Sequence, residues 1–549
     1  MILHLFRKFA GLPFKLDRVN EAASGRVTGA ELRASLPSLL KSGQLTAVRK
    51  SYGERLFSIP PACIPSLWNR LAPAAPEPVH APLVLLVKES GKGLAGDLFR
   101  TLSWIGQYGL PVTSKGTIHR KAIGKLTDLL SISEPDVSPL GLRYAHQDVY
   151  PAQLAVVLDM LFALGLLDQE TGSVRLLPER LSAWLSQDPA GMDAILLREL
   201  MARYLPDDPA VWHIAYRMML PDLPLGAWLS VESLLQSIID CGMLTGFSRD
   251  QQDWLQGWMQ ALSAFGWLDL GKDEAGAWML RWRRRPGLQT GVDSGEEDGQ
   301  ATVFKGQEMC YVQPDFEILV PPDVPFNTRW ELECCCECMT TDTMSIYRLT
   351  RRRAAHAYGL GRSPADLLEL LTACSREVPD NVVQTLLDWE RDLKRDMSGQ
   401  TLSDYSYPRL IKQDESSFKF FPTMHDQAWI QQGQCLHVYE RTDEVPGAEE
   451  LFPGNASIPS MWIRERRSYH SSTARSMLLQ AILWRTGVEL VLTSGESAFF
   501  IPAQIAGVQE WTVRGTLVKA NGTEQSGEED VLLGPDAWDR MGLHMPLLS

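Results

Sequence analysis

The sequence predicts a multi-domain protein that is mainly α-helical, with small units of mixed helix and strand (α+β). The chain has 549 residues, and single hydrophobic cores stop growing at about 250–300 residues, so roughly three to five domains are expected. Stretches rich in proline, glycine or polar residues, at 72–82, 205–209 and 287–300, mark the linkers. A pattern of one helix followed by two short apolar segments recurs in the first three pieces.

The composition is that of a soluble protein, with 45% hydrophobic and 22% charged residues. The most apolar stretch, 155–167, contains Asp159 and predicts a buried helix instead of a membrane span. The first 16 residues carry cations within their apolar part, unlike a secretion signal. Nine cysteines, an odd number, argue against a disulfide framework. We therefore expect a cytoplasmic protein with no membrane partner.

The recurring pattern predicts tandem winged-helix domains, because a helix that leads into a two-stranded hairpin is the second half of such a domain. The hairpins are expected to turn at Tyr52-Gly53, at Glu170-Thr171-Gly172 and at 273–276. The predicted domains span residues 1–75, 83–204 and 205–286.

Residues 301–396 predict an α+β domain. Apolar residues alternate with polar ones from Val312 to Val320, which is typical of a strand, and Pro321-Pro322 ends it. Thr328 and Glu331 have the spacing of a capping box and predict the start of a helix. The remaining predicted elements are a strand at 345–349 and helices at 354–358, at 363–371 with Ser363 as N-cap, and from Asn381 onward.

This part of the chain resembles the helicase-associated domain of XPB-type proteins, which precedes the ATPase motor in many bacterial members. The matching segments are Gln313-Pro314-Asp315-Phe316, Tyr347-Arg348-Leu349-Thr350, Gly361-Arg362-Ser363 and Val378-Pro379. The piece from Gly109 to Trp184 also resembles that family. The resemblance implies a role in DNA transactions.

The predicted C-terminal region, 397–549, is β-rich. Strand-like segments occur at 418–421, 435–439, 488–493 and 498–502, and a helix is expected at 471–484. The order of segments from Ala481 onward resembles WYL-type ligand-sensing domains, which have an SH3-like sheet.

The sequence lacks a recognisable ATPase motor. Gly266, Gly271 and Lys272 have the spacing of a phosphate-binding loop, but Asp273 stands where a Ser or Thr hydroxyl should bind magnesium. This segment is also expected on a hairpin that follows a helix. No Gly-x-Ser-x-Gly or HExxH motif occurs either. We therefore expect a protein that is not an enzyme, with no catalytic residues and no cofactor.

Four cysteines lie close together, at Cys334, Cys335, Cys336 and Cys338. Two of them, Cys334 and Cys338, would lie one helical turn apart and could share a metal ion. Structural zinc sites need a second ligand pair, and the sequence offers no CxxC or HxxxH partner. Because cysteine also packs as a small apolar residue, we favour a buried helix face over a metal site.

Clusters of basic residues are the positive sign of DNA binding, because Lys and Arg contact phosphates and guanine edges. A cluster on a predicted helix would suit the major groove, as in the recognition helices of this class. The net charge of −14 opposes this interpretation, although acidic runs at 295–298 and 527–530 account for part of it. The candidate DNA-binding residues are Lys115, Arg120, Lys121, Lys125, Arg281, Arg283, Arg284, Arg285, Arg351, Arg352 and Arg353.

Together these features predict a non-catalytic DNA-binding or helicase-accessory protein that works in repair, replication or transcription. Its expected partners are DNA and a separately encoded helicase, nuclease or transcription protein. The alternative is a protein–protein scaffold without direct DNA contact, because winged helices also serve as interaction modules. A third reading is a hydrolase in the C-terminal region.

Overall fold

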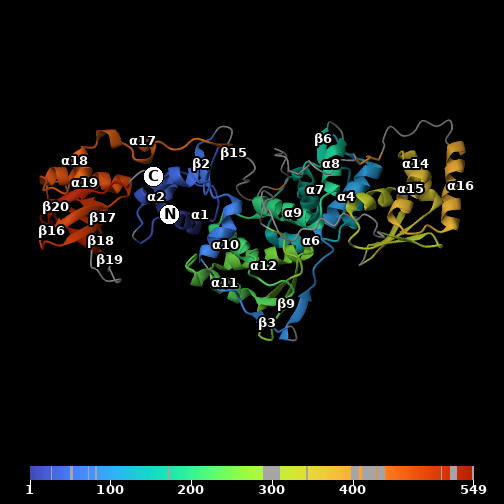
Figure 1. Ribbon diagram of the computed structural model, residues 1–549, viewed down its shortest axis with the longest axis horizontal. Helices are drawn as coiled ribbons and strands as arrows, with labels where there is room; N and C mark the ends of the chain where they lie inside the picture. The colour runs from blue at the N-terminus through green and yellow to red at the C-terminus, as the bar shows by residue number, and fades with distance from the viewer. Residues whose placement is uncertain are drawn as a thin grey trace.

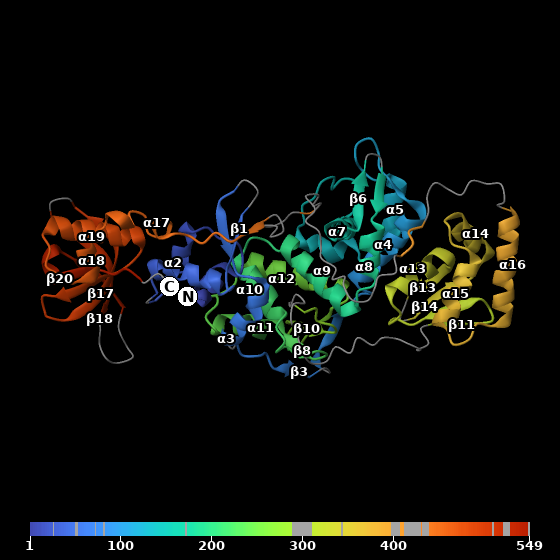
Figure 2. The same cartoon turned by 45° about the horizontal axis from the view of Figure 1, so that its top comes forward.

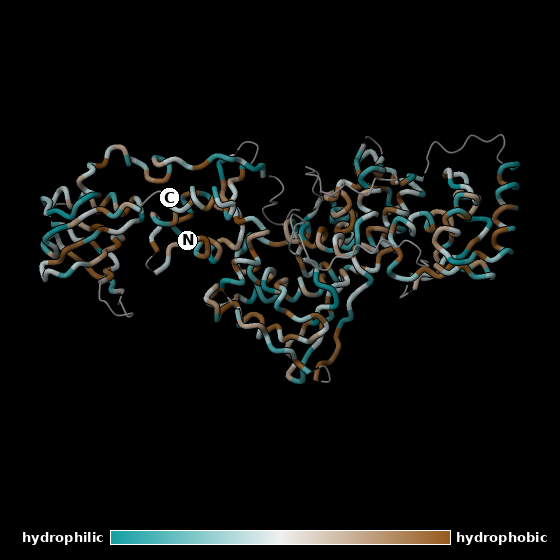
Figure 3. The backbone as a smooth tube through the Cα atoms, in the orientation of Figure 1, coloured by the Kyte–Doolittle hydropathy of each residue, from teal (hydrophilic) through white to brown (hydrophobic). Residues whose placement is uncertain are grey.

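The protein is elongated, with its C-terminal sheet at one end and residues 310–396 at the other in the computed structural model (Figure 1). Apolar residues are spread through every unit (Figure 3), and the buried ones form one cluster that includes residues of all the units. The structure describes residues 1–25, 27–49, 53–71, 73–80, 83–170, 173–287, 310–341, 344–396, 407–410, 430, 439–507, 510–519 and 528–546.

Three N-terminal units share one topology: a helix, a short strand, two more helices and a two-stranded hairpin. In each unit the first strand pairs with the last strand of the hairpin, as Phe14 does with Phe57 and Leu110 with Val174. The paired strands of all three predicted hairpins are present, while the predicted turn residues Tyr52, Thr171 and Gly172 lie outside the described residues. The first unit contains α1 (Ile2–Phe9), η1 (Asp17–Ala22), α2 (Gly29–Lys41), β1 (Thr46–Arg49) and β2 (Arg55–Ser58). The second contains α4 (Leu94–Tyr108), β5 (Leu110–Pro111), α5 (Arg120–Leu129), α7 (Ala152–Ala163), β6 (Leu167–Glu170) and β7 (Ser173–Leu176). The third contains α10 (Pro209–Met218), β8 (Trp228–Ser230), α11 (Val231–Asp240), α12 (Arg249–Ala264), β9 (Leu268–Lys272) and β10 (Trp278–Trp282).

The segments between these units add to their structure. Two short strands that precede the second unit join the sheet of the third, which has the strand order β3-β8-β10-β9-β4. The predicted linker 72–82 therefore contributes β3 to that sheet. The connecting elements are η2 (Pro61–Cys63), α3 (Ile64–Leu71), β3 (Pro78–Val79), β4 (Leu85–Lys88), α8 (Pro178–Leu185) and α9 (Pro189–Tyr204). The second unit differs from the other two by α6 (Glu134–Val137) and η4 (Ser138–Leu140), which lie between α5 and α7.

The predicted buried helix in the second unit is confirmed as α7, in which every residue from Leu154 to Ala163 is buried. Asp159 is tolerated there because its carboxylate accepts hydrogen bonds from the Arg203 guanidinium, the Tyr204 hydroxyl and the Ile430 N–H. No helix in the described ranges is long and apolar enough to cross a membrane.

Residues 310–396 form a four-stranded antiparallel sheet, ordered β11-β12-β14-β13, with four helices. The predicted strand at 345–349 and the Ser363 cap are confirmed, the latter as a capping box with Asp366. The elements are β11 (Tyr311–Val312), β12 (Glu317–Val320), α13 (Phe326–Cys335), β13 (Glu337–Thr341), β14 (Ser345–Arg348), α14 (Arg351–Gly359), α15 (Pro364–Cys374) and α16 (Asp380–Asp396).

Two local predictions in this domain were wrong. The expected strand at 312–320 is interrupted by a turn at Pro314-Asp315, a turn-forming pair, and Phe316 has a φ of 70°. The following helix begins at Phe326, with Pro325 at the N-cap, and not at Thr328. Packing explains the earlier start, because the Phe326 ring stacks on Phe99 of α4, with centroids 4.7 Å apart.

The C-terminal unit is a five-stranded antiparallel sheet, ordered β19-β18-β17-β16-β20, with α19 against it. The helix at 471–484 and the strands near 488 and 498 are confirmed. The segment 418–421 and all of 435–439 except Tyr439 lie outside the described residues. The elements are β15 (Glu440–Thr442), α17 (Ala448–Leu451), η6 (Asn455–Ser457), α18 (Ser460–Arg464), α19 (Ser471–Trp484), β16 (Val488–Leu492), β17 (Ser497–Ala506), β18 (Thr512–Lys519), β19 (Glu528–Leu533), η7 (Pro535–Ala537) and β20 (Trp538–Leu543).

The chain returns along its own length to reach the C-terminal unit. Tyr407 packs on Trp330 of α13, Ile430 bonds to α7, and β15 pairs with β1 of the first unit. The first and last units are therefore neighbours, as the blue and red ends of Figure 2 show.

Candidate nucleic-acid interface

The basic cluster of the second unit lies on and just before α5. Val112 and Ile118 form a bridge around a tight turn in which Gly116 has a φ of 79°. This turn carries Lys115 at its tip, and α5 follows with Arg120, Lys121 and Lys125. All four side chains are exposed, and none is joined to an acidic side chain among the described residues.

Helix α5 holds its cations outward because its apolar residues Ala122, Ile123 and Leu126 are buried against the unit. Lys121 and Lys125 are four residues apart, so their Cβ atoms lie roughly 6 Å apart on one face. The N-terminal end of a helix also carries a partial positive charge, which adds to the attraction for an anion near Arg120. The cluster therefore presents unneutralised positive charge to solvent.

This basic helix is the second helix of its unit, and not the third. In the winged-helix reading the helix that would enter a DNA groove is the one directly before the hairpin, which here is α7. That α5 acts as a recognition helix therefore stays a prediction. The third helices are α2, α7 and α12, and their central residues are largely buried. Of the three, α7 is buried from Leu154 to Ala163, whereas the first turn of α12 is exposed at Arg249, Asp250, Gln252 and Asp253.

The arginines that follow the third hairpin are engaged within the protein. The buried carboxylate of Asp269 accepts from Arg281 at 2.6 Å and lies 2.7 Å from the Arg283 guanidinium. Arg284 lies 3.2 Å from the Asp193 carboxylate, and Arg285 donates to the carbonyls of Leu223 and Pro221. Because their charges are matched or their donors are satisfied within the protein, these four arginines are not part of the candidate interface.

The arginines at the start of α14 have mixed surroundings. Arg351 pairs with Asp392 of α16 at 3.2 Å, and Arg352 pairs with Glu337 at the same distance. The Arg353 guanidinium instead reaches α4 of the second unit, where it donates to the Gln107 side chain and to the Tyr108 hydroxyl at 3.2 Å. Arg353 therefore holds two units together.

The junction around Arg353 is an extensive contact between α13 and α4. Gln107 donates to the Glu333 carbonyl at 3.0 Å, and Arg353 donates to the same carbonyl at 2.7 Å. The Trp330 ring stacks on Tyr407 with centroids 4.5 Å apart and meets the Phe99 ring of α4 edge-on at 6.3 Å. Burial raises the pKa of the Glu333 carboxyl, which also accepts a hydrogen bond from the Tyr347 hydroxyl. Sequence reasoning missed this junction, because its contacts join residues more than 200 positions apart.

The cysteine cluster lies in this domain. Helix α13 ends at Cys335 and Cys338 lies on β13, so Cys334 and Cys338 are not one helical turn apart. Cys334, Cys335 and Cys336 are buried in the core, which agrees with the packing interpretation. Among the described residues no group of three or more His, Cys, Asp or Glu side chains is arranged to hold a metal ion.

The phosphate-loop-like segment is part of a sheet. Gly271 and Lys272 lie on β9, which pairs with β10 on one side and β4 on the other. The Lys272 ammonium lies 4.7 Å from the centre of the Trp278 ring. A strand paired on both edges has no open loop that could surround a phosphate.

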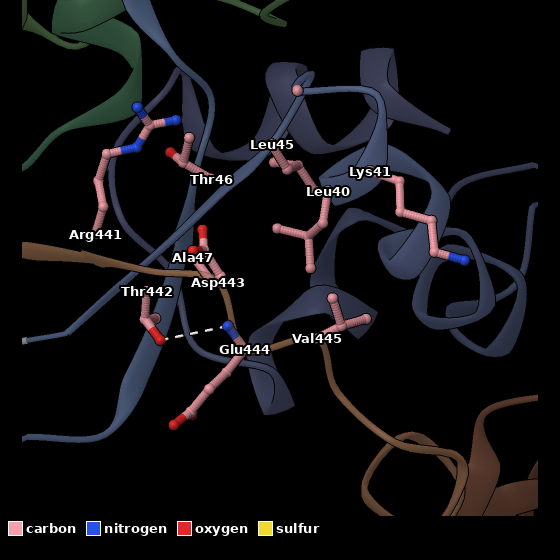
Figure 4. A pocket seen from close by; sticks show the side chains of 11 residues that line it. Leu40, Lys41, Leu45, Thr46, Ala47, Arg441, Thr442, Asp443, Glu444 and Val445 are labelled. Carbon is pink, nitrogen blue, oxygen red and sulfur yellow. Dashed lines mark hydrogen bonds between the residues drawn. The ribbon is translucent and has the colours of Figure 1, made fainter.

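A pocket of about 220 Å³ lies where β15 meets the first unit (Figure 4). Its walls carry charges of both signs, with Lys41 and Arg441 opposed by Asp443 and Glu444. The Glu444 N–H donates to the Thr442 hydroxyl at 3.3 Å, which shapes the turn at its mouth. This mixed lining favours neither an anion nor a cation, so the pocket has no part in the interface.

Comparison with known proteins identifies one part of the chain. Residues 310–399 match the family described as the helicase conserved C-terminal domain. A search of curated proteins found no match. The matched range contains the sheet and four helices of residues 310–396, the domain that contacts α4. The XPB-type assignment stays a prediction. Residues 310–399 are therefore a helicase-associated domain.

Proposed function

We propose that this protein is a non-catalytic accessory of a helicase or another DNA-processing complex, and that it contacts DNA through the edge formed by Lys115, Arg120, Lys121 and Lys125. The observation that carries the proposal is the lack of acidic partners at these four exposed cations in the described chain. The helicase-associated domain, which contacts the neighbouring helix α4, also supports a role in a DNA-processing complex.

The mode of contact follows from which surfaces are free. A winged-helix reading of the three units is supported by their shared order of helices and strands, and by the pairing of first and last strands. Because α7, the helix before the hairpin of the second unit, is buried, the expected contacts of the α5 edge are to phosphates. Such contacts position a protein on DNA but carry no sequence information.

The test is binding of the full-length protein to duplex, forked and single-stranded DNA across a salt series. The variant Arg120→Ala/Lys121→Ala/Lys125→Ala removes three phosphate contacts, so the slope of log affinity against log salt should become shallower by about 2.7 for duplex DNA. A matched control is Arg391→Ala/Lys394→Ala/Arg514→Ala, which removes three exposed cations that each pair with an acid. Equal effects of both triple variants would refute the proposed edge.

The alternative, a scaffold that binds proteins only, is favoured by the burial of α7 and by the net charge of −14. It predicts no DNA binding even at low salt. In that case the helicase-associated domain and its junction with α4 become the surface on which to seek a protein partner.

A further inference from the structure

The C-terminal residue of α4, Tyr108, has an unusual environment for an exposed aromatic side chain. Its exposed fraction is 51%, yet its ring stacks on His356 of α14, with centroids 5.5 Å apart and planes 25° apart. The Trp104 ring lies 5.2 Å away, and the Tyr108 hydroxyl accepts a hydrogen bond from Arg353. Contacts from two units therefore fix the ring while half of its surface faces solvent.

This ring lies close to the basic edge of α5. Pro111 is three positions after Tyr108, and its carbonyl accepts a hydrogen bond from the His119 N–H at 3.3 Å. His119 directly precedes Arg120, the first residue of α5. Three extended residues span at most about 10 Å, so one oligonucleotide is long enough to touch both Tyr108 and Arg120. On the side of the helicase-associated domain, the Arg352 side chain is 86% exposed.

We propose that Tyr108 is a stacking position for an unpaired base of single-stranded nucleic acid, whose phosphates lie along α5. The inference rests on the proposed function and specifies the form of nucleic acid that this site prefers. Proteins that bind single strands combine a cationic track with aromatic rings on which bases stack. Bases inside a duplex already stack on each other, so Tyr108 adds affinity only where bases are unpaired.

The charge around the ring favours this ligand over an apolar peptide. Tyr108 lies near the basic edge of α5, whose four cations have no acidic partner among the described residues, whereas Arg351 and Arg352 at the start of α14 are paired with Asp392 and Glu337. A polyanion gains from the unpaired cations of α5, whereas an apolar helix would have to desolvate them. The restrained ring also loses little conformational freedom when a base stacks on it.

The test compares a single-stranded oligonucleotide with a duplex of equal length, each binding the full-length protein at fixed salt. Tyr108→Ala should weaken single-strand binding by about 5- to 150-fold, equivalent to about 1–3 kcal/mol of stacking, and should leave duplex binding unchanged. Tyr108→Phe keeps the ring and should bind the single strand within about threefold of the original protein. Hydrogen exchange at α4 and α14 in each variant shows that the junction remains folded.

The outcomes separate this inference from the function on which it rests. Loss of duplex and single-strand binding to the same extent in Tyr108→Ala would overturn stacking, as would unchanged single-strand binding. If the triple variant of α5 loses binding while Tyr108→Ala does not, the DNA contact stands and the stacking position falls. Absence of binding by the original protein to either form would overturn both.

Discussion

Replacing Arg353 with alanine tests whether the helicase-associated domain is rigidly docked on the second unit. The Arg353 guanidinium donates to the Cys336 carbonyl at 3.0 Å and to the Glu333 carbonyl at 2.7 Å within its own domain. Its other donors reach Gln107 and Tyr108 of α4. One side chain thus fixes the end of α13 and the end of α4 at the same time.

The expected loss of docking free energy depends on which hydrogen-bond acceptors are left without a donor in Arg353→Ala. A hydrogen bond from a charged donor contributes about 1.5–3 kcal/mol, but bonds that share one donor group do not add. The Glu333 carbonyl keeps its bond from Gln107, whereas the Cys336 carbonyl loses the guanidinium. We therefore expect docking to weaken by about 2–4 kcal/mol in total. Arg353→Lys should recover only part of this, because an ammonium cannot reproduce the planar fork.

The assay is hydrogen exchange of backbone amides near the ends of α4 and α13 and the start of α14. A loss of 2–4 kcal/mol accelerates exchange through local opening by roughly 30- to 1,000-fold. The neighbouring variant Arg352→Ala is the control, because it removes one exposed ion pair and should cost less than about 1 kcal/mol. Equal exchange in Arg353→Ala and Arg352→Ala would refute the role assigned to Arg353.

Two further predictions concern stability elsewhere. Burial lowers the pKa of His213 to about 4, so the folded protein favours the neutral ring, and stability should fall as the pH drops from about 6.5 toward 4. Unfolding by denaturant at pH 7 and pH 5 should show a smaller difference in His213→Phe, and an unchanged difference would contradict this. Gly124→Ala should stabilise α5 by up to about 1 kcal/mol, because a Cβ there meets open space. Gly271→Ala should destabilise, because its Cβ would lie 2.5 Å from Val84, and equal melting temperatures for the two variants would refute this contrast.

Local patterns predicted much of the secondary structure, because strand alternation and helix caps depend on neighbouring residues. The helix at 471–484, the cap at Ser363 and the three hairpins are examples. Errors arose where distant packing overrode the local signal, as at Phe326, whose contact with Phe99 lengthens α13. No sequence spacing could reveal that contact, since the two rings are more than 200 residues apart.

The candidate site shows the same division. A run of arginines indicates positive charge, but it does not indicate where the opposing carboxylates lie. Asp269 is 12 residues from Arg281 and is the buried partner of two arginines. From the sequence, each basic cluster was an equally good candidate for contact with DNA. Only the acidic partners seen in the structure distinguish the arginines of the third unit from the unpaired cations of α5.

The same reasoning decides how the net charge of −14 bears on DNA binding. At about 0.1 M salt the Debye length is about 10 Å, so charges farther than this from a bound phosphate are largely screened. DNA phosphates bound at α5 would then be attracted by Lys121 and Lys125 and only weakly repelled by the more distant acidic surface. At about 0.01 M salt the length is about 30 Å, and repulsion from the whole protein opposes binding. The salt series should therefore be read above 0.1 M, where the slope reports local contacts, because a shallow slope at low salt would reflect the acidic surface and not a lack of phosphate contacts.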